Sequence, residues 1–268
     1  MIKNILSIAG SDPSGGAGIQ ADLKTIAACG GYGMAAITAL TAQNTQEVSG
    51  VHMPPAEFLR AQLVAIFEDI QVDAVKIGMA GDAQTIAVIA DMLEQYKPKH
   101  IVLDPVMVAT SGDVLLQDDA VKALKNNLIP MAHVLTPNLP EAQILCGMSA
   151  AREMSDLSDA LMGLGAGAVF LKGGHGGGAE SNDLFLSADE SEIMKAARIE
   201  TNNTHGTGCT LSSAIATYLA QGQNVINACR KAKAYVHRAI AAADGLGVGG
   251  AGGAQGHGPL HHFYEWQN

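Results

Sequence analysis

The residues best suited to chemistry form one short string, residues 202–210 (NNTHGTGCT), directly before a long apolar stretch with helical spacing. Glycines on both sides of Thr207 let backbone N–H groups turn toward one point, where the N-terminus of the following helix adds partial positive charge. Gly206, Thr207 and Gly208 are therefore predicted to bind phosphate or to stabilise charge during phosphoryl transfer. Considered alone, the string is better explained as a glycine-rich turn with Thr207 as a helix cap.

Cys209 lies in the first turn of the same predicted helix. A helix N-terminus lowers the pKa of a thiol from its ordinary value of about 8.5, so we expect a lowered pKa and a catalytic role for Cys209. The other cysteines, Cys29, Cys146 and Cys229, are expected to be small buried apolar residues. No two cysteines have the C-x-x-C spacing, and the four suggest no disulfide framework.

Three more polar residues follow predicted strands and suit a phosphorylated ligand or a cation. Glu141 stands at a predicted helix start, three residues after Asn138, and could hold Mg²⁺ through water. A plain helix N-terminus explains it equally well. Lys172 precedes a run of glycines, where its ammonium could reach a phosphate or stay in solvent. Asp104 is either a second carboxylate on the metal side or a polar end to its strand.

Residues 16–21 (GAGIQA) match the G-x-G-x-x-G/A pattern of dinucleotide-binding proteins and follow a predicted strand. That pattern also needs an acidic residue about 20 positions further on. Residues 37–44 contain none, so we reject a dehydrogenase. The loop is better used to recognise a small substrate.

Polar side chains at the ends of the first two predicted strands would surround that substrate: Ser11, Asp12, Asp22, Gln43 and Asn44. Gln43 carries a paired donor and acceptor, the pattern needed to read an aminopyrimidine edge. Met79 could lie flat against a heteroaromatic ring. Taken singly, Met79 and Val106 are better explained as core residues.

The hydrophobic pattern gives the elements that position these residues. Short apolar strands alternate with helices almost throughout, which indicates a largely parallel sheet covered on both faces, with ligands beyond the carboxyl ends of its strands. The predicted strands, each buried on both faces, are residues 5–9, 35–40, 74–77, 101–103, 133–135 and 168–171. The predicted helices are residues 17–29, 56–69, 82–95, 118–129, 139–146, 155–164, 207–221 and 224–243.

The composition favours a single domain over residues 1–268. The chain is 48% apolar and 16% charged, and it shows no repeat or linker. Its net charge is -10 without a Lys/Arg run, which argues against a nucleic-acid partner. We find no signal-peptide pattern and no apolar stretch of membrane-spanning length, so we expect no membrane association and a cytoplasmic protein. The glycine-dense residues 245–258 are predicted to be a mobile loop before a short tail, residues 259–268.

Seven strings, in order, resemble the hydroxymethylpyrimidine/phosphomethylpyrimidine kinases of thiamine biosynthesis, within the ribokinase-like superfamily. The resemblance runs from about residue 4 to the HHF tail at residues 261–263. The strings are residues 9–22 (AGSDPSGGAGIQAD), 41–44 (TAQN), 76–79 (KIGM), 104–107 (DPVM), 136–142 (TPNLPEA), 172–175 (KGGH) and 206–209 (GTGC).

This resemblance implies a three-layer α/β/α sandwich with a central, mostly parallel sheet, and a homodimer. It implies two reactions with ATP and Mg²⁺, from hydroxymethylpyrimidine to its monophosphate and then to the diphosphate. The substrate would be bound by Gly10, Asp22, Gln43, Met79 and Val106. The nucleotide would be bound by Thr136, Asn138, Lys172, Thr207 and Lys233, with Glu141 and Asp104 on the metal side. Cys209 would stand where the superfamily has its catalytic base.

Most sugar kinases that this chain resembles carry an aspartate at the position of Cys209. We hypothesise that the thiol suits a two-step task. In the first step it helps to take up the alcohol proton. In the second step the nucleophile is already an anionic phosphate oxygen, and a carboxylate about 4 Å away would repel it by roughly 4 kcal/mol at an effective dielectric of 20. A neutral thiol would not.

Two alternatives stay open at this point. One is a pyridoxal-type kinase, because related enzymes pair the G-T-G-C string with a pyridine alcohol; Gln43 and Met79 favour the pyrimidine. The other is a catalytically silent metabolite sensor on the same fold. Lys172, Glu141 and Cys209, all present, argue against the sensor.

Overall fold

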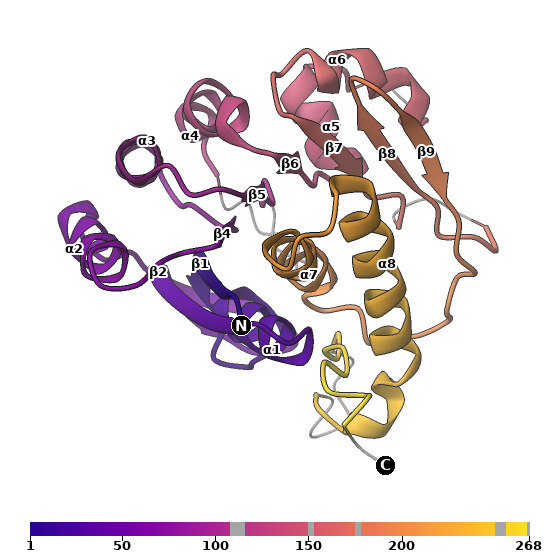
Figure 1. The fold of residues 1–268 in the computed structure, drawn as a ribbon. Helices are drawn as coiled ribbons and strands as arrows, with labels where there is room; N and C mark the ends of the chain where they lie inside the picture. Colours follow the sequence, from indigo (N-terminus) through magenta and orange to yellow (C-terminus); the bar gives the residue numbers. More distant parts are fainter. Residues whose placement is uncertain (108–115, 150–152, 175–177, 250–255, 267–268) are drawn as a thin grey trace.

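The structure is a computed structural model that describes residues 1–107, 116–149, 153–174, 178–249 and 256–266. Its centre is a mixed sheet with helices on both faces (Figure 1). The strand order is β3-β2-β1-β4-β5-β6-β7-β8-β9. The strands are β1 (Asn4–Ser11), β2 (Tyr32–Gln43), β3 (Val48–His52), β4 (Ala74–Ile77), β5 (Ile101–Leu103), β6 (Val134–Leu135), β7 (Ala168–Leu171), β8 (Asp183–Ser187) and β9 (Ser191–Met194).

The six strands from β2 to β7 run parallel, and β3, β8 and β9 extend the sheet antiparallel at its two edges. Parallel strands place all their carboxyl ends at one edge of the sheet, so the residues that follow them can meet there. This arrangement confirms the predicted α/β class with a mostly parallel sheet.

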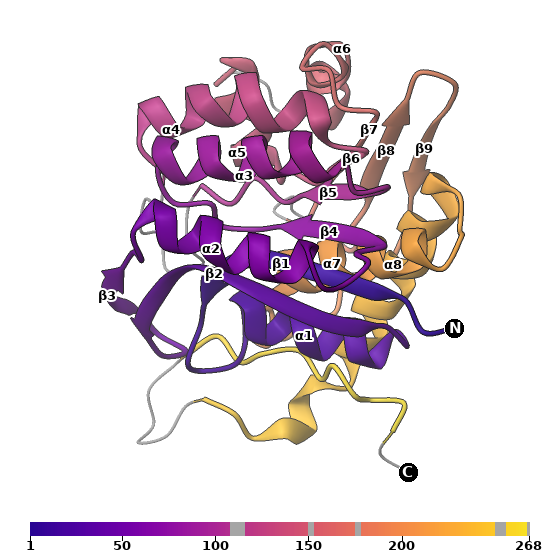
Figure 2. The same cartoon turned by 60° about the vertical axis from the view of Figure 1, so that its left-hand side comes forward.

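Two helical layers cover the sheet (Figures 1 and 2). One face packs against α1 (Gly18–Ala28), α7 (Thr207–Ala220) and α8 (Val225–Ala241). The other face packs against α2 (Ala56–Phe67), α3 (Ala83–Tyr96), α4 (Asp118–Ala123), α5 (Leu139–Cys146) and α6 (Ser158–Met162). Short helical turns complete the chain: η1 (Leu124–Leu128), η2 (Ile129–Met131), η3 (Met154–Leu157) and η4 (Ala243–Leu246).

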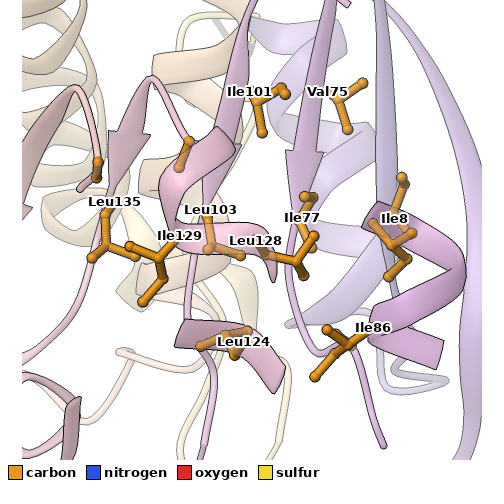
Figure 3. Packing of buried hydrophobic residues seen from close by; sticks show 14 of the residues in the cluster. Ile8, Val75, Ile77, Ile86, Ile101, Leu103, Leu124, Leu128, Ile129 and Leu135 are labelled. Atoms are coloured by element: carbon orange, nitrogen blue, oxygen red, sulfur yellow. The ribbon is translucent and has the colours of Figure 1, made fainter. Parts of the chain in front are cut away.

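Alternation along the central strands separates the two cores. Ile77 and Leu103 point to the face covered by α3, where they pack with Ile86 (Figure 3). Ala74 and Val102 point to the opposite face, toward α7 and α8. Each central strand is thus buried on both sides and mostly apolar, as the apolar runs predicted.

Most predicted elements are present, and three of the strands have the predicted bounds: β4, β5 and β7. The prediction missed β3, β8 and β9. β3 and β9 are short edge strands with exposed positions, whereas β8 lies between β7 and β9 and is buried at four of its five positions. It was wrong that β2 is buried on both faces, because β2 lies next to the edge strand and its Leu40 is 45% exposed. The single helix predicted over residues 118–129 is α4 followed by a π turn, η1, with Pro130 in the next turn.

The region after α8 is only partly described. Of the predicted loop 245–258, residues 250–255 lie outside the described residues, and Gly245 belongs to η4. The flanking residues are ordered against the rest of the chain: His257 N–H donates to the Thr45 carbonyl at 2.9 Å. Within the described part of the chain, no helix is long and apolar enough to cross a membrane.

Candidate active site

A cavity of about 650 Å³ opens at the carboxyl edge of the parallel strands. It brings together predicted residues from six strand ends, from the start of α7 and from α8. The predicted residues that line it are Gly10, Gln43, Met79, Asp104, Val106, Asn138, Glu141, Lys172, Gly206, Thr207, Gly208, Cys209 and Lys233. Residues separated by up to about two hundred positions in sequence thus share one site, because the topology gathers them at one edge.

Three predicted contact residues do not line this cavity, and one of them, Asn44, is exposed just after β2. Asp22, predicted to bind substrate, is fully buried, and Lys76 Nζ donates to both of its carboxylate oxygens at 2.8 Å. Thr136, predicted to bind nucleotide, is also fully buried, and its hydroxyl donates to Asp104 Oδ1 at 3.2 Å. Both of these buried residues instead hold charged groups that do reach the cavity, Lys76 and Asp104.

The start of α7 is shaped by a close contact between two glycine loops. Gly206 has a positive φ of 80°, and a Cβ on it would collide with the Gly16 carbonyl oxygen, so only glycine fits there. The Thr207 amide and hydroxyl both turn back to the Thr204 carbonyl, at 3.3 and 2.6 Å. Thr207 therefore does not supply the amide donor that we predicted for it.

The available donors are the next two amides. In the described part of the chain, the backbone N–H groups of Gly208 and Cys209 have no hydrogen-bond acceptor, as is usual in the first turn of a helix. Both residues line the cavity. The structure therefore retains an anion-binding helix N-terminus but shifts its donors one residue along the chain.

Cys209 lies where two helix N-termini meet. It is in the first turn of α7, and the backbone N–H of Gly18, the first residue of α1, donates to its sulfur. Burial nevertheless raises the pKa of the Cys209 thiol to about 11, an effect that Lys76 and the Gly18 N–H only partly offset. The predicted lowering of this pKa was wrong, because loss of solvation outweighs the helix dipoles.

Lys172 stands opposite two carboxylates at the cavity wall. Its ammonium is 2.8 Å from Asp104 Oδ1 and 3.8 Å from Glu141 Oε2. Burial opposes the charge on Lys172, but Asp104 and then Glu141 raise its pKa. Burial raises the pKa of Glu141 to about 7, and the nearby Asp104 charge adds to this while Lys172 opposes it. One cation, Lys172, thus faces two buried carboxylates, Asp104 and Glu141. When both carboxylates are ionised, this three-residue cluster has an excess of negative charge.

Glu141 has a structural role as well. Asn138 caps α5: its side chain accepts from Glu141 N at 2.8 Å, and Glu141 Oε2 accepts from Asn138 N at 2.7 Å. This capping box holds the carboxylate at the cavity wall. Both interpretations of Glu141 are therefore compatible. No group of three or more acidic, histidine or cysteine ligands exists among the residues described.

The predicted apolar and amide groups for the substrate also line the cavity. Gln43 is the last residue of β2, and its Oε1 lies 3.1 Å from the Thr41 hydroxyl. Met79 is anchored by its carbonyl, which accepts from the Thr38 hydroxyl at 2.6 Å. A Cβ on Gly10 would lie 2.6 Å from the Met79 methyl carbon, so the absence of a side chain at Gly10 leaves room for Met79.

Lys233 lines a third part of the cavity, on α8. Its ammonium donates to Asp183 Oδ2 at 2.6 Å and to the Ser181 carbonyl at 2.8 Å. Apolar side chains beside it come from Leu211, Val236 and Ile240. This end combines an apolar wall with a paired cation.

Sequence reasoning missed two residues of the site, Lys76 and His205. Lys76 lies inside an otherwise apolar strand, and a lysine there requires a buried partner, which Asp22 inside apolar α1 provides. His205 directly precedes Gly206, and its ring lies 2.9 Å from Asp12 Oδ2. Lys76 could have been found from its apolar surroundings, whereas nothing local to His205 indicates Asp12 as its partner.

Comparison with known proteins agrees with this geometry. The family model of phosphomethylpyrimidine kinase matches residues 12–261. A hydroxymethylpyrimidine/phosphomethylpyrimidine kinase of Rhizobium meliloti is 54% identical over 264 residues, covering 97% of each chain. The ADP complex of Bacillus subtilis pyridoxal kinase superposes with a TM-score of 0.90 at 34% identity and covers 100% of both chains. The phosphomethylpyrimidine kinase of Clostridium difficile gives a TM-score of 0.79 at 42% identity over 89% of this chain and 99% of that one.

These matches extend over nearly the whole chain, and the predicted strings fall inside the family match except for residues 9–11. The structural neighbours confirm the predicted ribokinase-like fold. The chain belongs to the phosphomethylpyrimidine kinase family, a family of phosphotransferases.

Proposed function

We propose that this protein transfers the γ-phosphoryl group of ATP to hydroxymethylpyrimidine, and then a second phosphoryl group to the resulting monophosphate, in thiamine biosynthesis. The observation that carries the proposal is that Gln43, Met79, Cys209 and the free amides of α7 all line one cavity. A ring held by Gln43 and Met79 would have its hydroxymethyl group within the same cavity as the thiol and those amides.

At the substrate end, the Gln43 amide pairs with the ring nitrogen and amino group of the pyrimidine. Met79 and Val106 contact the two faces of the ring, and Gly10 leaves space beside Met79. The pocket therefore selects a flat heteroaromatic alcohol with a donor–acceptor edge.

At the phosphoryl end, the Gly208 and Cys209 amides and the Lys172 ammonium receive the charge of the transferred group. Asn138 and Lys233 contact the nucleotide, and the apolar wall of α8 packs against its base. The Cys209 thiol, with a pKa of about 11, is neutral near pH 7. It therefore does not repel the anionic phosphate oxygen that attacks in the second step.

We also propose that Mg²⁺ binds beside Glu141 and Asp104. The supporting observation is the excess of carboxylate over Lys172, together with the raised pKa of Glu141, which marks a site in need of a cation. Mg²⁺ keeps several waters and needs only one or two protein carboxylates in addition to phosphates. When bound, it would neutralise charge on the nucleotide phosphates.

A mass-spectrometric time course with ATP, Mg²⁺ and free hydroxymethylpyrimidine tests the proposal. We expect the monophosphate to appear first and the diphosphate later, with one ADP per phosphoryl group. No ADP above the rate without pyrimidine would overturn the phosphotransfer proposal and revive the silent sensor.

The role of the thiol is tested by two substitutions. Cys209→Ala should slow the alcohol step far more than the monophosphate step, and Cys209→Asp should selectively slow the second step. Cys146→Ala, whose half-buried thiol does not line the cavity, is the matched control and should change neither. Equal losses in both steps for both Cys209 variants would contradict the two-step hypothesis.

A second candidate substrate is pyridoxal, favoured by the TM-score of 0.90 to a pyridoxal kinase. The Gln43 amide argues for the pyrimidine, because its donor–acceptor pair matches an aminopyrimidine edge. Competition between the two alcohols in one reaction decides between them: we expect the pyrimidine to have the higher kcat/KM.

We propose, finally, that the protein forms a homodimer through the β2–β3 edge of the sheet. That edge exposes Leu40, Val51 and the nearby Phe58, each more than 40% exposed, and β3 has an unpaired outer side. Light scattering on Val51→Lys should then report a monomer where the unchanged chain reports a dimer. A monomer for both would refute it.

A further inference from the structure

The N-terminal glycine loop and the loop before α7 meet through one buried pair of side chains. His205 Nε2 donates to Asp12 Oδ2 at 2.9 Å, and the two residues are 193 positions apart in sequence. His205 is 6% exposed and Asp12 2%. Both line the cavity, yet neither has a role in the proposed phosphotransfer described so far.

Asp12 is also the anchor of its own loop. Its carboxylate accepts from Ser14 N at 2.8 Å, Ser14 Oγ at 2.7 Å, Gly16 N at 3.2 Å and Ala17 N at 2.8 Å. Burial alone would raise the pKa of Asp12, but the hydrogen bonds, first that of His205, hold it at about 2. The carboxylate is therefore ionised, and it fixes the backbone up to the residue before Gly18.

The same loop reaches the thiol directly. Gly18 follows Ala17 and its N–H donates to the Cys209 sulfur. On the other side of the pair, His205 is bonded through the chain to Gly206, whose Cα faces the Gly16 carbonyl. The contacts form a closed ring: Asp12 to Ala17, Gly18 to Cys209, and Cys209 back along the chain to His205.

The chain segment after α8 joins the same ring. His205 N–H donates to the Gly258 carbonyl at 3.0 Å, and His257 N–H donates to the Thr45 carbonyl at 2.9 Å. Thr45 stands two residues after Gln43. The His205 backbone is thus connected to the substrate end of the cavity, while its side chain is connected to the thiol end.

We propose that Asp12 and His205 are a positioning pair, which holds the Gly18 amide and the Gly208–Cys209 amides in register with the substrate for phosphoryl transfer. This inference rests on the proposed kinase function. Neither side chain exchanges a proton with the substrate. Loss of the pair lets the two glycine loops separate, so that substrate still binds but the donors no longer point at the transferred group.

Steady-state kinetics of His205→Ala test this, with the unchanged enzyme measured in parallel. We expect kcat to fall about 100-fold, the loss typical of misplacing reacting groups by about 1 Å, in both phosphoryl steps. The KM values for ATP and for the pyrimidine should change less than about 3-fold, since ring and base contacts remain. His205→Gln, whose amide N–H can reach Asp12, should recover about 10-fold of the lost kcat.

A double-substitution cycle separates positioning from simple destabilisation. Adding His205→Ala to Asp12→Asn should be no slower than Asp12→Asn alone, because the carboxylate through which His205 acts is already lost. The loop bonds of Asp12 are altered in both of these variants, so they cancel in the comparison. His133→Gln, an exposed histidine directly before β6 and thus at the amino edge of the sheet, is the control and should keep full kcat. If His205→Ala does not fold, His205→Leu, which also cannot donate to Asp12, takes its place in the cycle.

Three results would overturn the positioning role: multiplicative losses in the cycle, a loss confined to KM, or no loss at all in a variant of unchanged melting temperature. An unchanged enzyme that makes no ADP would instead refute the proposed function, so the two failures are distinguishable.

Discussion

Two buried lysine–aspartate pairs flank the start of α7, and they differ in how their charges balance. Lys76 and Asp22 are both 0% exposed, with one positive and one negative charge. The Ser7 and Ser213 hydroxyls also donate to the Asp22 carboxylate, at 2.6 and 2.8 Å. The charge of each residue in this first pair is balanced by hydrogen bonds and by the opposite charge within the protein. The pair connects β4 to α1, and through Ser213 to α7.

The second pair, Lys172 and Asp104, reaches the cavity, and its charges are not balanced. Lys172 is 15% exposed to the cavity, and Glu141 adds a second acid to the one cation. The balanced pair can only hold structure, whereas the unbalanced cluster can accept a cation or release Lys172 to a phosphate. The difference separates a structural ion pair from a functional one, although both are buried and both use lysine and aspartate.

The largest effect should come from the balanced pair. Lys76→Met leaves the Asp22 carboxylate buried without its cation, which costs about 3–5 kcal/mol of folding free energy. At about 2–4 °C per kcal/mol, the melting temperature should fall by roughly 10 °C. Calorimetry measures this melting temperature. Combining Asp22→Asn with Lys76→Met should recover more than half of the lost melting temperature. A melting temperature within about 2 °C of the unchanged protein would show that this pair is not structural.

Lys172→Met should have the opposite profile. We expect kcat to fall about 10²–10³-fold, because a donor to the transferred group is lost. Stability should change little, since Glu141 can take up a proton when its cation is removed. Kinetics and calorimetry on the same preparation test both halves. A loss of stability equal to that of Lys76→Met would mean that the two clusters do not differ.

The sequence predicts the layers and most of the site, because apolar runs and turn glycines are local signals. Lys172, Glu141 and Cys209 were found at strand ends and a helix start, where chain position alone predicts their location. The side chains with which these buried charged residues pair could not be predicted from the sequence. That Asp22 pairs with Lys76 and does not reach the substrate depends on α1 lying over β4, a contact between distant segments. The pKa of Cys209 was wrong for the same reason, since burial is a property of the folded chain.

Glu141→Gln probes the open cluster through the cation. The substitution keeps the hydrogen bond from Asn138 N but removes the negative charge. The Mg²⁺ concentration for half-maximal rate should rise about 10-fold, the lower end of the range for residues that act on a metal through an intervening group. Titration of the rate with Mg²⁺ at saturating ATP measures it, and Glu153→Gln, in a surface capping box that does not line the cavity, is the control. An unchanged Mg²⁺ requirement would place the metal elsewhere.

The same substitution should stabilise the protein, and its pH dependence gives the smallest and most specific test. The pKa of Glu141 is raised from 4.5 to about 7, so the folded state binds this proton more tightly than the unfolded state. The resulting stability is present below pH 4.5 and is lost as the pH rises through 7, where the buried carboxylate must ionise. Glutamine mimics the protonated acid at every pH. Glu141→Gln should therefore melt near the unchanged protein at pH 5 but about 3 °C higher at pH 8, a gain of about 1 kcal/mol.

The equivalent substitution in the balanced pair, Asp22→Asn, should lower the melting temperature at both pH values, because Lys76 then has no counterion. A Glu141→Gln variant that is less stable at pH 8 than at pH 5, relative to the unchanged protein, would show that Lys172 balances both acids and that the cluster has no excess charge to offer a cation.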